Sequence, residues 1–291
     1  MSEDPRPAPV PTPSAASSAR PVSNLGVRLV SALVLALATL AALYGGHPFW
    51  PLLVLVMTMA LAWEWNRMLQ ETGTPAAVVL LLMLALVVGL ATVGQMVWAI
   101  VLAVAAAAGL AAAGGAVHRL THSLGLLYFG LPSVAMIWLA ADAADGAQAV
   151  LFIMIVVWAT DSAAYFTGRT LGGPKLWPSV SPNKTWSGSL GGLAGALLAG
   201  LVVAWLAGAP SLAWITVLSL LLSMGCQAGD LLESALKRRF DRKDTSGLIP
   251  GHGGVMDRLD GLLVAVVLAA LIGLWRNPEN PGIALLAGGG A

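Results

Sequence analysis

Apolar residues run through this chain in long blocks that short polar connections separate. A helix that crosses a bilayer needs about 20 mostly apolar residues, whereas a membrane barrel strand alternates apolar and polar residues over about 10. The blocks have the first pattern, so the sequence predicts an all-α, polytopic integral membrane helix bundle with about nine spans. The predicted spans are residues 27–46, 48–67, 76–93, 95–114, 123–141, 148–168, 188–207, 211–232 and 258–275.

The order of polar and apolar blocks divides the chain into three regions. Residues 1–24 are rich in Pro, Ala and Ser and lack the apolar core of a signal peptide, which predicts a disordered cytoplasmic tail. Residues 25–145 form N-terminal membrane helices with Ala and Gly for close packing. Residues 146–291 contain the polar motifs, and we expect the catalytic region there.

Composition narrows the class of protein further. The chain is 58% hydrophobic and 10% charged, with a mean hydropathy of +0.83. A formal net charge of +1 gives no basis for nucleic-acid binding. The single cysteine, Cys226, excludes an intrachain disulfide and a cysteine zinc cluster, and we expect it to be a small packing residue.

Basic residues occupy alternate connections between the predicted spans. In the nine-span arrangement every Lys and Arg except Arg276 falls on one side. The positive-inside rule then places the N-terminus and the charged loops in the cytoplasm, and the C-terminus outside an inner (plasma) membrane.

Charge is concentrated near the end of the chain. Twelve of the 29 charged residues (15 Lys and Arg plus 14 Asp and Glu) lie between Asp230 and Asp260. In "QAGDLLESALKRR", Asp230, Glu233, Ser234 and Lys237 fall on one helix face. The basic residues that follow suit phosphate oxygens, although they could simply attract anionic lipid.

The segment "KDTSGLIPGHGGVMDRLDG" combines glycines with two carboxylates. Its glycine backbone N–H groups can approach an anion closely, while His252 could be an ordinary surface residue. Asp257 and Asp260 open the last span, and oxygen ligands of this kind suit a hard divalent cation. The helix dipole alone would explain one of these two carboxylates.

Two further segments carry polar groups next to spans. In "WATDSAAYFTGRTLGG", Asp161 either lines a site or pairs with Arg169 at the membrane surface. In "SPNKTWSG", Asn183, Lys184 and Thr185 precede a helix, where free N–H groups and a cation suit a phosphate. An ordinary polar turn that caps the helix is the alternative.

These motifs resemble those of the phosphatidate cytidylyltransferases, also called CDP-diacylglycerol synthases. The family's long C-terminal signature reads "SALKRRFDRKDTSGLIPGHGGVMDRLD" here, from Ser234 to Asp260, and "SPNKTWSG" and "ATDSAAYFTGR" are similar to family motifs. The specific match covers about the last 130 residues, and the front half matches only as a set of spans.

The resemblance implies that CTP and phosphatidate react at the cytoplasmic face of the bilayer to give CDP-diacylglycerol and pyrophosphate. It implies dependence on Mg²⁺, with one cation or two, and a homodimer is an assembly that the sequence leaves open. Asp230 and Asp257 match the family's metal ligands. The predicted site has the catalytic residues Asp230, Asp257, Lys237 and Lys243, the metal ligands Asp230 and Asp257 with Asp260 as a further candidate, and the substrate-binding residues Ser181, Asn183, Lys184, Thr185, Asp161, Ser234, Arg238, Asp244, Gly251, His252, Gly253, Gly254 and Arg258.

Two other functions are compatible with parts of the sequence. A CTP-dependent polyprenol or phytol kinase would transfer the γ-phosphoryl group instead, and the complete signature argues against it. A secondary transporter would use Asp161 and Asp230 for cation coupling. The charges, however, gather in predicted cytoplasmic loops rather than at mid-membrane, and the sequence shows no inverted repeat.

The charge pattern makes a prediction about topology. A reporter that is active only outside the cytoplasm should be active when fused after Ala291 and silent when inserted between Arg239 and Asp244. Reporter activity measured in intact cells checks both positions. Activity at both would contradict the nine-span arrangement.

Overall fold

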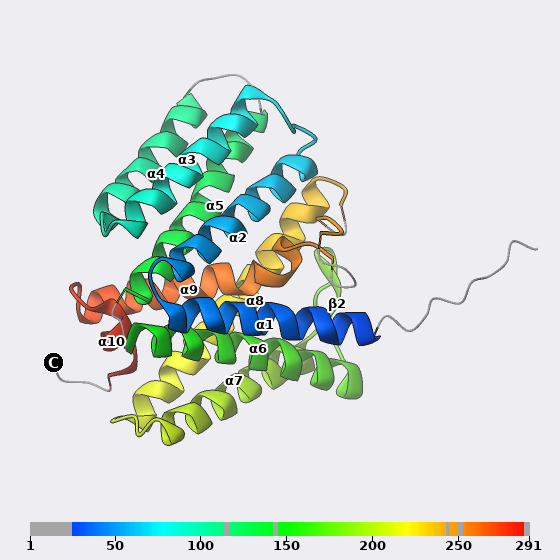
Figure 1. Ribbon diagram of the computed structural model, residues 1–291. Coiled ribbons are helices and arrows are strands. Elements are labelled where there is room, and N and C mark those ends of the chain that lie inside the picture. Colours follow the sequence, from blue (N-terminus) through cyan, green and yellow to red (C-terminus); the bar gives the residue numbers. More distant parts are fainter. Residues whose placement is uncertain (1–24, 113–116, 142–144, 243–244, 249–252, 288–291) are drawn as a thin grey trace, which may run out of the picture.

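The computed structural model describes residues 25–112, 117–141, 145–242, 245–248 and 253–287. These residues form a helical bundle with one small β-hairpin (Figure 1). The elements are α1 (Leu25–Gly45), α2 (Phe49–Met68), α3 (Pro75–Thr92), α4 (Met96–Ala112), α5 (Val117–Leu139), α6 (Asp145–Leu171), β1 (Lys175–Trp177), β2 (Ser181–Thr185), α7 (Trp186–Leu206), α8 (Leu212–Arg239), α9 (Met256–Arg276) and α10 (Pro281–Leu286).

Among the described residues, seven helices are long and apolar enough to cross a membrane. They are α2, α3 and α5 to α9, while α1 and α4 contain the shorter apolar helices Val30–Gly45 and Met96–Ala112. The predicted all-α membrane bundle is therefore confirmed, and the count of nine spans stays a prediction. The predicted segments coincide with α1 to α9, and the largest extension is at the end of α8, which continues to Arg239.

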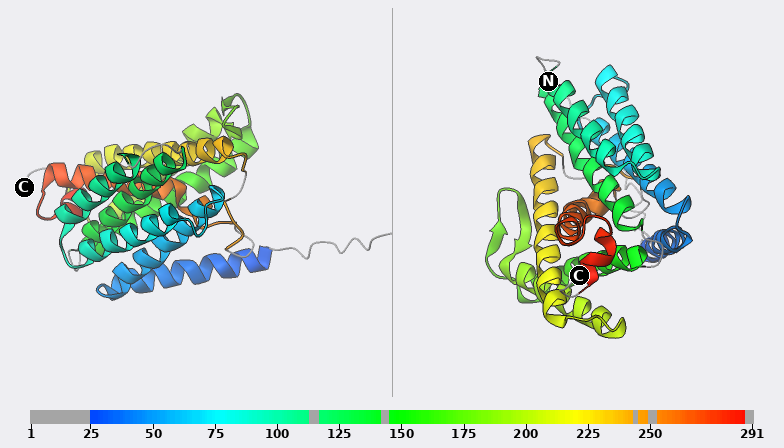
Figure 2. Two further views of the ribbon diagram at one scale, coloured as in Figure 1. Left: turned by 90° about the horizontal axis from the view of Figure 1, so that it is seen from above. Right: turned by 90° about the vertical axis from the view of Figure 1, so that its left-hand side faces the viewer.

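The helices pack as two groups that meet along α5 and α9. In the first group α5 contacts α2, α3 and α4, and in the second α6 to α9 contact one another, with α10 beside α6 and α9. The two views in Figure 2 show the same grouping. The motif-bearing helices therefore form one group, and the first group supports it through α5 and, at one end, through α2.

Close packing of small residues joins α6 to α7. A Cβ atom added to Gly195 would overlap that of Ala163, and one added to Gly191 would overlap the side chain of Thr167. Small residues allow helix backbones to approach closely in a membrane, where dispersion replaces much of the hydrophobic driving force. This contact fixes the polar ends of α6 and α7, from which the hairpin projects.

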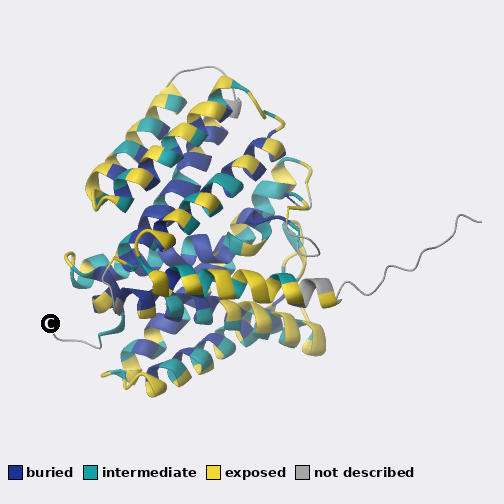
Figure 3. Ribbon diagram, viewed as in Figure 1, coloured by how far each residue is buried: buried dark blue, intermediate teal, exposed yellow. Residues whose placement is uncertain are grey.

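Burial follows the pattern expected for helices in a bilayer. Large apolar side chains such as Leu33, Leu82 and Leu198 are exposed on outward helix faces (Figure 3). Inside the bundle, two pairs of polar side chains satisfy each other: the Thr160 hydroxyl donates to Ser223 at 3.0 Å, and Thr58 and Ser133 share a hydrogen bond of 2.6 Å. These pairs satisfy groups that would otherwise be costly away from water.

A two-stranded antiparallel sheet replaces the simple polar turn before α7. Strands β1 and β2 pair Lys175 with Thr185 and Trp177 with Ser181. Thr185 is also the N-cap of α7, and its hydroxyl accepts a hydrogen bond from Gly188 N at 3.1 Å. The segment "SPNKT" thus does two things: it caps α7, and it forms a strand that reaches toward α8.

Candidate active site

The polar motifs meet at one end of the bundle. The end of α8, the start of α9, the end of α2 and the β-hairpin lie on the right-hand side of Figure 1. Chain segments that are far apart in the sequence therefore supply charged side chains to one region.

Lys237 lies between two carboxylates from different helices. Its ammonium group is 3.0 Å from Glu233 Oε2, one turn back on α8, and it donates to Asp257 Oδ1 of α9 at 2.8 Å. The side chains are mostly or fully enclosed, with 14% of Lys237, 12% of Asp257 and 0% of Glu233 exposed. Attraction between such enclosed charges is screened little by solvent, so Lys237 joins α8 to the start of α9.

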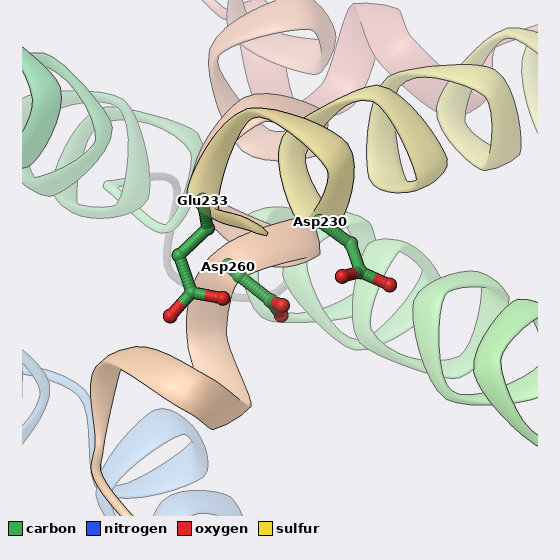
Figure 4. A group of neighbouring side chains, drawn as sticks. All are labelled: Asp230, Glu233 and Asp260. Carbon is green, nitrogen blue, oxygen red and sulfur yellow. The ribbon is translucent and has the colours of Figure 1, made fainter. Parts of the chain in front are cut away.

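A cluster of three carboxylates lies beside this lysine. Asp230 and Glu233 come from α8 and Asp260 from α9, and one oxygen of each lies within 4.8 Å of the others. Figure 4 shows the three side chains directed into the same space next to the two helices. The sequence places Asp230 and Asp260 among its candidates, and the structure brings them together.

Glu233 is the most deeply buried member of the cluster. Both of its oxygens are enclosed and make no hydrogen bond of good geometry with the described residues, although Lys237 approaches one of them. Lys237 is shared between Glu233 and Asp257, so the negative charge of the carboxylate cluster is only partly compensated, and a divalent cation would compensate it further. Three carboxylates form the all-oxygen donor set that Mg²⁺ takes. The residues present therefore fit a divalent cation.

The hairpin adds a second cation to the site. Lys184 of β2 forms an ion pair with Asp230, and both side chains are partly exposed, 26% and 32% respectively. The pair connects the "SPNKT" strand to α8, which the sequence alone does not show. A phosphate that enters from water could therefore reach Lys184.

Asp257 anchors both ends of the glycine-rich loop, a name used here for the described residues 245–248 and 253–255. Its Oδ2 accepts hydrogen bonds from Gly254 N at 2.9 Å, Thr245 Oγ1 at 3.0 Å and Thr245 N at 3.3 Å. Gly253 has a φ of +88°, a conformation that glycine adopts without strain. In this structure Asp257 therefore contacts the loop and Lys237, and the carboxylate cluster next to Lys237 contains Asp260 instead. The assignment of Asp257 as a metal ligand stays a prediction.

Asp161 lies exposed on α6, on the side that faces α8. Its Oδ1 accepts a weak hydrogen bond from the Cys226 thiol at 3.6 Å, and Cys226 is buried, as expected for a packing residue. The alternative interpretation of the sequence pairs Asp161 with Arg169 at the membrane surface. In the structure Arg169 instead donates to the Tyr165 hydroxyl at 2.7 Å. Arg169 therefore has another partner, and the interpretation of Asp161 as a residue that lines the site stays a prediction.

The remaining predicted residues take varied positions. Arg238 donates to Val180 O at 3.5 Å and so reaches the hairpin turn. Ser181 and Ser234 are half-buried, whereas Asn183 and Arg258 are exposed. Lys243, Asp244, Gly251 and His252 lie outside the described residues, and their roles stay predictions.

Two contributors were not predicted as site residues. Glu233 shares the α8 stripe of Asp230 and Lys237, and its membership of that stripe is the signal that could have found it. Glu64 of α2 is fully buried against the glycine-rich loop. It is one of two charged residues in an otherwise apolar predicted span, and ionisable residues in spans are functional candidates by default.

An apolar groove runs along α5 and α9 from near the carboxylate cluster. Its volume is about 330 Å³. Val264, Val267 and Leu271 continue the helix face of Asp260 along α9, so the groove and the cluster share one stripe. The opposite wall comes from α5, and the lining residues are Leu127, Tyr128, Leu131, Pro132, Leu263, Val264, Val267, Leu268 and Leu271.

Comparison with known proteins identifies the class. The profile described as the cytidylyltransferase family matches residues 26–275, and the chain belongs to this family. It is therefore an enzyme, a nucleotidyltransferase, and its apolar helices make it an integral membrane protein.

Named relatives agree over most of the chain. A phosphatidate cytidylyltransferase of Brucella suis biovar 1 (strain 1330) is 39% identical over 278 residues, which cover 89% of this chain and 97% of the relative. One from Brucella abortus biovar 1 (strain 9-941) is 40% identical over 276 residues, with the same coverage. One from Bacillus subtilis (strain 168) is 44% identical over 119 residues, 40% of this chain and 44% of the relative.

Proposed function

We propose that this cytidylyltransferase transfers the cytidylyl group of CTP to phosphatidate, giving CDP-diacylglycerol and pyrophosphate. One observation supports the proposal beyond the family: lysines pair with carboxylates beside a carboxylate cluster, and an apolar groove begins one helical turn beyond Asp260 of that cluster. A polyphosphate substrate needs the first feature, and a substrate with acyl chains needs the second. The names of the relatives support the same pair of substrates.

To catalyse this reaction, the protein must position the two substrates and neutralise the charge of their phosphates. A phosphate oxygen of phosphatidate attacks the α-phosphorus of CTP, the bond to the bridging oxygen breaks, and pyrophosphate leaves. Such in-line transfers are catalysed mainly by orientation and electrostatic stabilisation. In this proposal Lys184 and Lys237 neutralise phosphate oxygens; in the structure Lys184 pairs with Asp230, and Lys237 pairs with Glu233 and Asp257.

The carboxylate cluster is the proposed Mg²⁺ site. Asp230 and Asp260 are candidate ligands from the sequence that also lie in the cluster, and Glu233 lies next to them. Asp257, which pairs with Lys237 in the structure, remains the second metal ligand that the resemblance implies. When bound, Mg²⁺ would supply positive charge for the phosphates of CTP.

The position of the site suits two substrates that arrive from different phases. Lys184 lies at the partly exposed hairpin, and the groove opens along membrane-spanning helices. We propose that CTP enters from the cytoplasm and phosphatidate from the inner-membrane leaflet, with the N-terminus cytoplasmic and the C-terminus outside. The homodimer and the division of the chain at about residue 145 stay predictions.

One assay tests the function directly. Full-length protein in detergent with phosphatidate, Mg²⁺ and CTP labelled in its α-phosphate should produce a lipid that carries CMP, together with pyrophosphate. Thin-layer chromatography of the lipid and a pyrophosphate assay measure the two products. Release of CDP and an unlabelled lipid would instead indicate γ-phosphoryl transfer by a lipid kinase.

The cluster predicts which residues control the metal. Asp230→Asn and Asp260→Asn each remove a negative ligand, so both should weaken binding of Mn²⁺, used as a spectroscopic substitute for Mg²⁺, by roughly tenfold or more. Electron paramagnetic resonance of free Mn²⁺ measures this without turnover. Asp241→Asn, on the exposed turn after α8, is the control and should bind Mn²⁺ normally.

The third aspartate separates two arrangements. If Asp257→Asn loses Mn²⁺ as strongly as Asp230→Asn, Asp257 belongs to the ion, as predicted from the sequence. If Asp257→Asn weakens Mn²⁺ binding and Asp260→Asn leaves it unchanged, the proposed cluster is wrong.

The groove predicts an effect confined to the lipid substrate. Val267→Trp places a large ring among the lining residues and should raise the KM for phosphatidate several-fold while leaving the KM for CTP unchanged. Leu198→Trp, on the exposed face of α7, is the matched control. Steady-state kinetics in mixed micelles measure both constants, and equal effects of the two variants would contradict an acyl role for the groove.

A further inference from the structure

Glu64 links the N-terminal helices to the glycine-rich loop. It lies near the end of α2, its side chain is fully buried, and among the described residues its hydrogen-bond donors all belong to the other half of the chain. Its carboxylate accepts from Val255 N at 2.8 Å and Met256 N at 2.7 Å, positions 191 and 192 residues away. A buried carboxylate needs such donors, because desolvation without them is costly.

These two bonds supply a cap that α9 lacks in its own sequence. Val255 occupies the N-cap position, and its apolar side chain cannot accept a hydrogen bond. The first N–H groups of a helix have no intrahelical partner, and a negative charge near them is stabilised by the helix dipole. Glu64 therefore caps α9 from another helix and fixes the first turn, which carries Asp257.

Glu64 also holds the opposite end of the loop. The hydroxyl groups of Thr245 and Ser246 both donate to its carboxylate, so one side chain joins residues 245 and 246 to residues 255 and 256. Gly254 packs directly against it, and a Cβ atom there would lie 2.8 Å from the Glu64 oxygens. The loop is thus closed at its base around Glu64.

Glu64 is connected to Asp257 through one side chain, the hydroxyl group of Thr245. Thr245 Oγ1 lies 3.2 Å from Glu64 and 3.0 Å from Asp257, and its one proton can serve only one of them at a time. An aromatic contact supports the same junction: the rings of Trp65 and Phe240 meet edge-to-face at 6.4 Å, where the chain leaves α8. The end of α2 therefore contacts the connection between α8 and α9 at its start and at its base.

We propose that Glu64 is a positioning residue for the nucleotide: by capping α9 and closing the base of the glycine-rich loop, it holds the loop and Asp257 in the arrangement that binds CTP. This role gives the N-terminal half a part in nucleotide binding. The interpretation of the kinetics rests on the proposed function. The structural part, the closure of the loop by Glu64, does not.

The central variant is Glu64→Gln, which keeps the size of the side chain and replaces one acceptor oxygen with an N–H₂ group that faces donors. Loss of a hydrogen bond to a charged group weakens binding, that is, raises the dissociation constant, by roughly tenfold or more. We expect the KM for CTP to rise by about this factor, with the KM for phosphatidate unchanged. A role in folding alone would lower kcat per total protein and leave both KM values as they were.

Hydrogen exchange provides a readout that does not depend on turnover. In full-length protein without substrate, the amides of Val255 and Met256 should exchange roughly tenfold faster in Glu64→Gln, because their acceptor is weakened. Glu71→Gln is the matched control, since Glu71 lies just beyond α2 and pairs with His122 at 3.5 Å. It should leave the loop amides and the KM for CTP unchanged.

Ser246→Ala keeps the experiment informative if Glu64→Gln does not fold. It removes one of the four donors and should change the same two quantities in the same direction by a smaller factor. An unchanged KM for CTP together with unchanged exchange at Val255 and Met256, in whichever variant folds, overturns the proposal. If the wild-type protein makes no lipid-linked CMP, the proposed function fails, while exchange and direct CTP binding by calorimetry still test Glu64.

Discussion

The arrangement of the site depends on one ammonium group between two carboxylates. Lys237 contacts Glu233 on its own helix and Asp257 on the next, and all three side chains are largely withdrawn from solvent. Removing one member of such a set would leave an uncompensated charge inside the protein, which is costly. The lysine therefore fixes how α8 packs against α9. Through Asp257, which accepts hydrogen bonds from Thr245 N and Gly254 N, it also holds the two ends of the glycine-rich loop together.

The helices could be predicted from the sequence because each apolar block has one stable solution in a bilayer. The end of α8 was harder to place, since Asp230, Glu233 and Lys237 interrupt the apolar run while continuing its helical periodicity. The hairpin was missed because strands of three and five residues carry almost no periodic signal. The confirmed fold class thus follows from hydropathy, whereas the hairpin follows from the packing of α6 against α7.

The motif residues of the last third were recognisable by type, but their partners were not. Asp260 lies with Asp230 and Glu233, whereas Asp257 is occupied by Lys237, Thr245 and Gly254. Both aspartates open the same helix, and only the direction of each side chain separates them. The role of Glu64 was hard to predict for another reason: two of its four donors are backbone N–H groups, which every residue except proline has, so the sequence does not mark them.

The ion pair between Lys184 and Asp230 has a thermodynamic consequence. In the protein without ligands the cation and the carboxylate neutralise each other. In the proposed function, a nucleotide phosphate bound to Lys184 would leave Asp230 without its counter-ion, and a divalent cation bound to Asp230 would release Lys184. Each ligand thereby removes the competitor of the other, and linkage requires the two effects to be equal in free energy. Nucleotide and metal would then bind with positive cooperativity, so that the site with both ligands bound is favoured over the site with one.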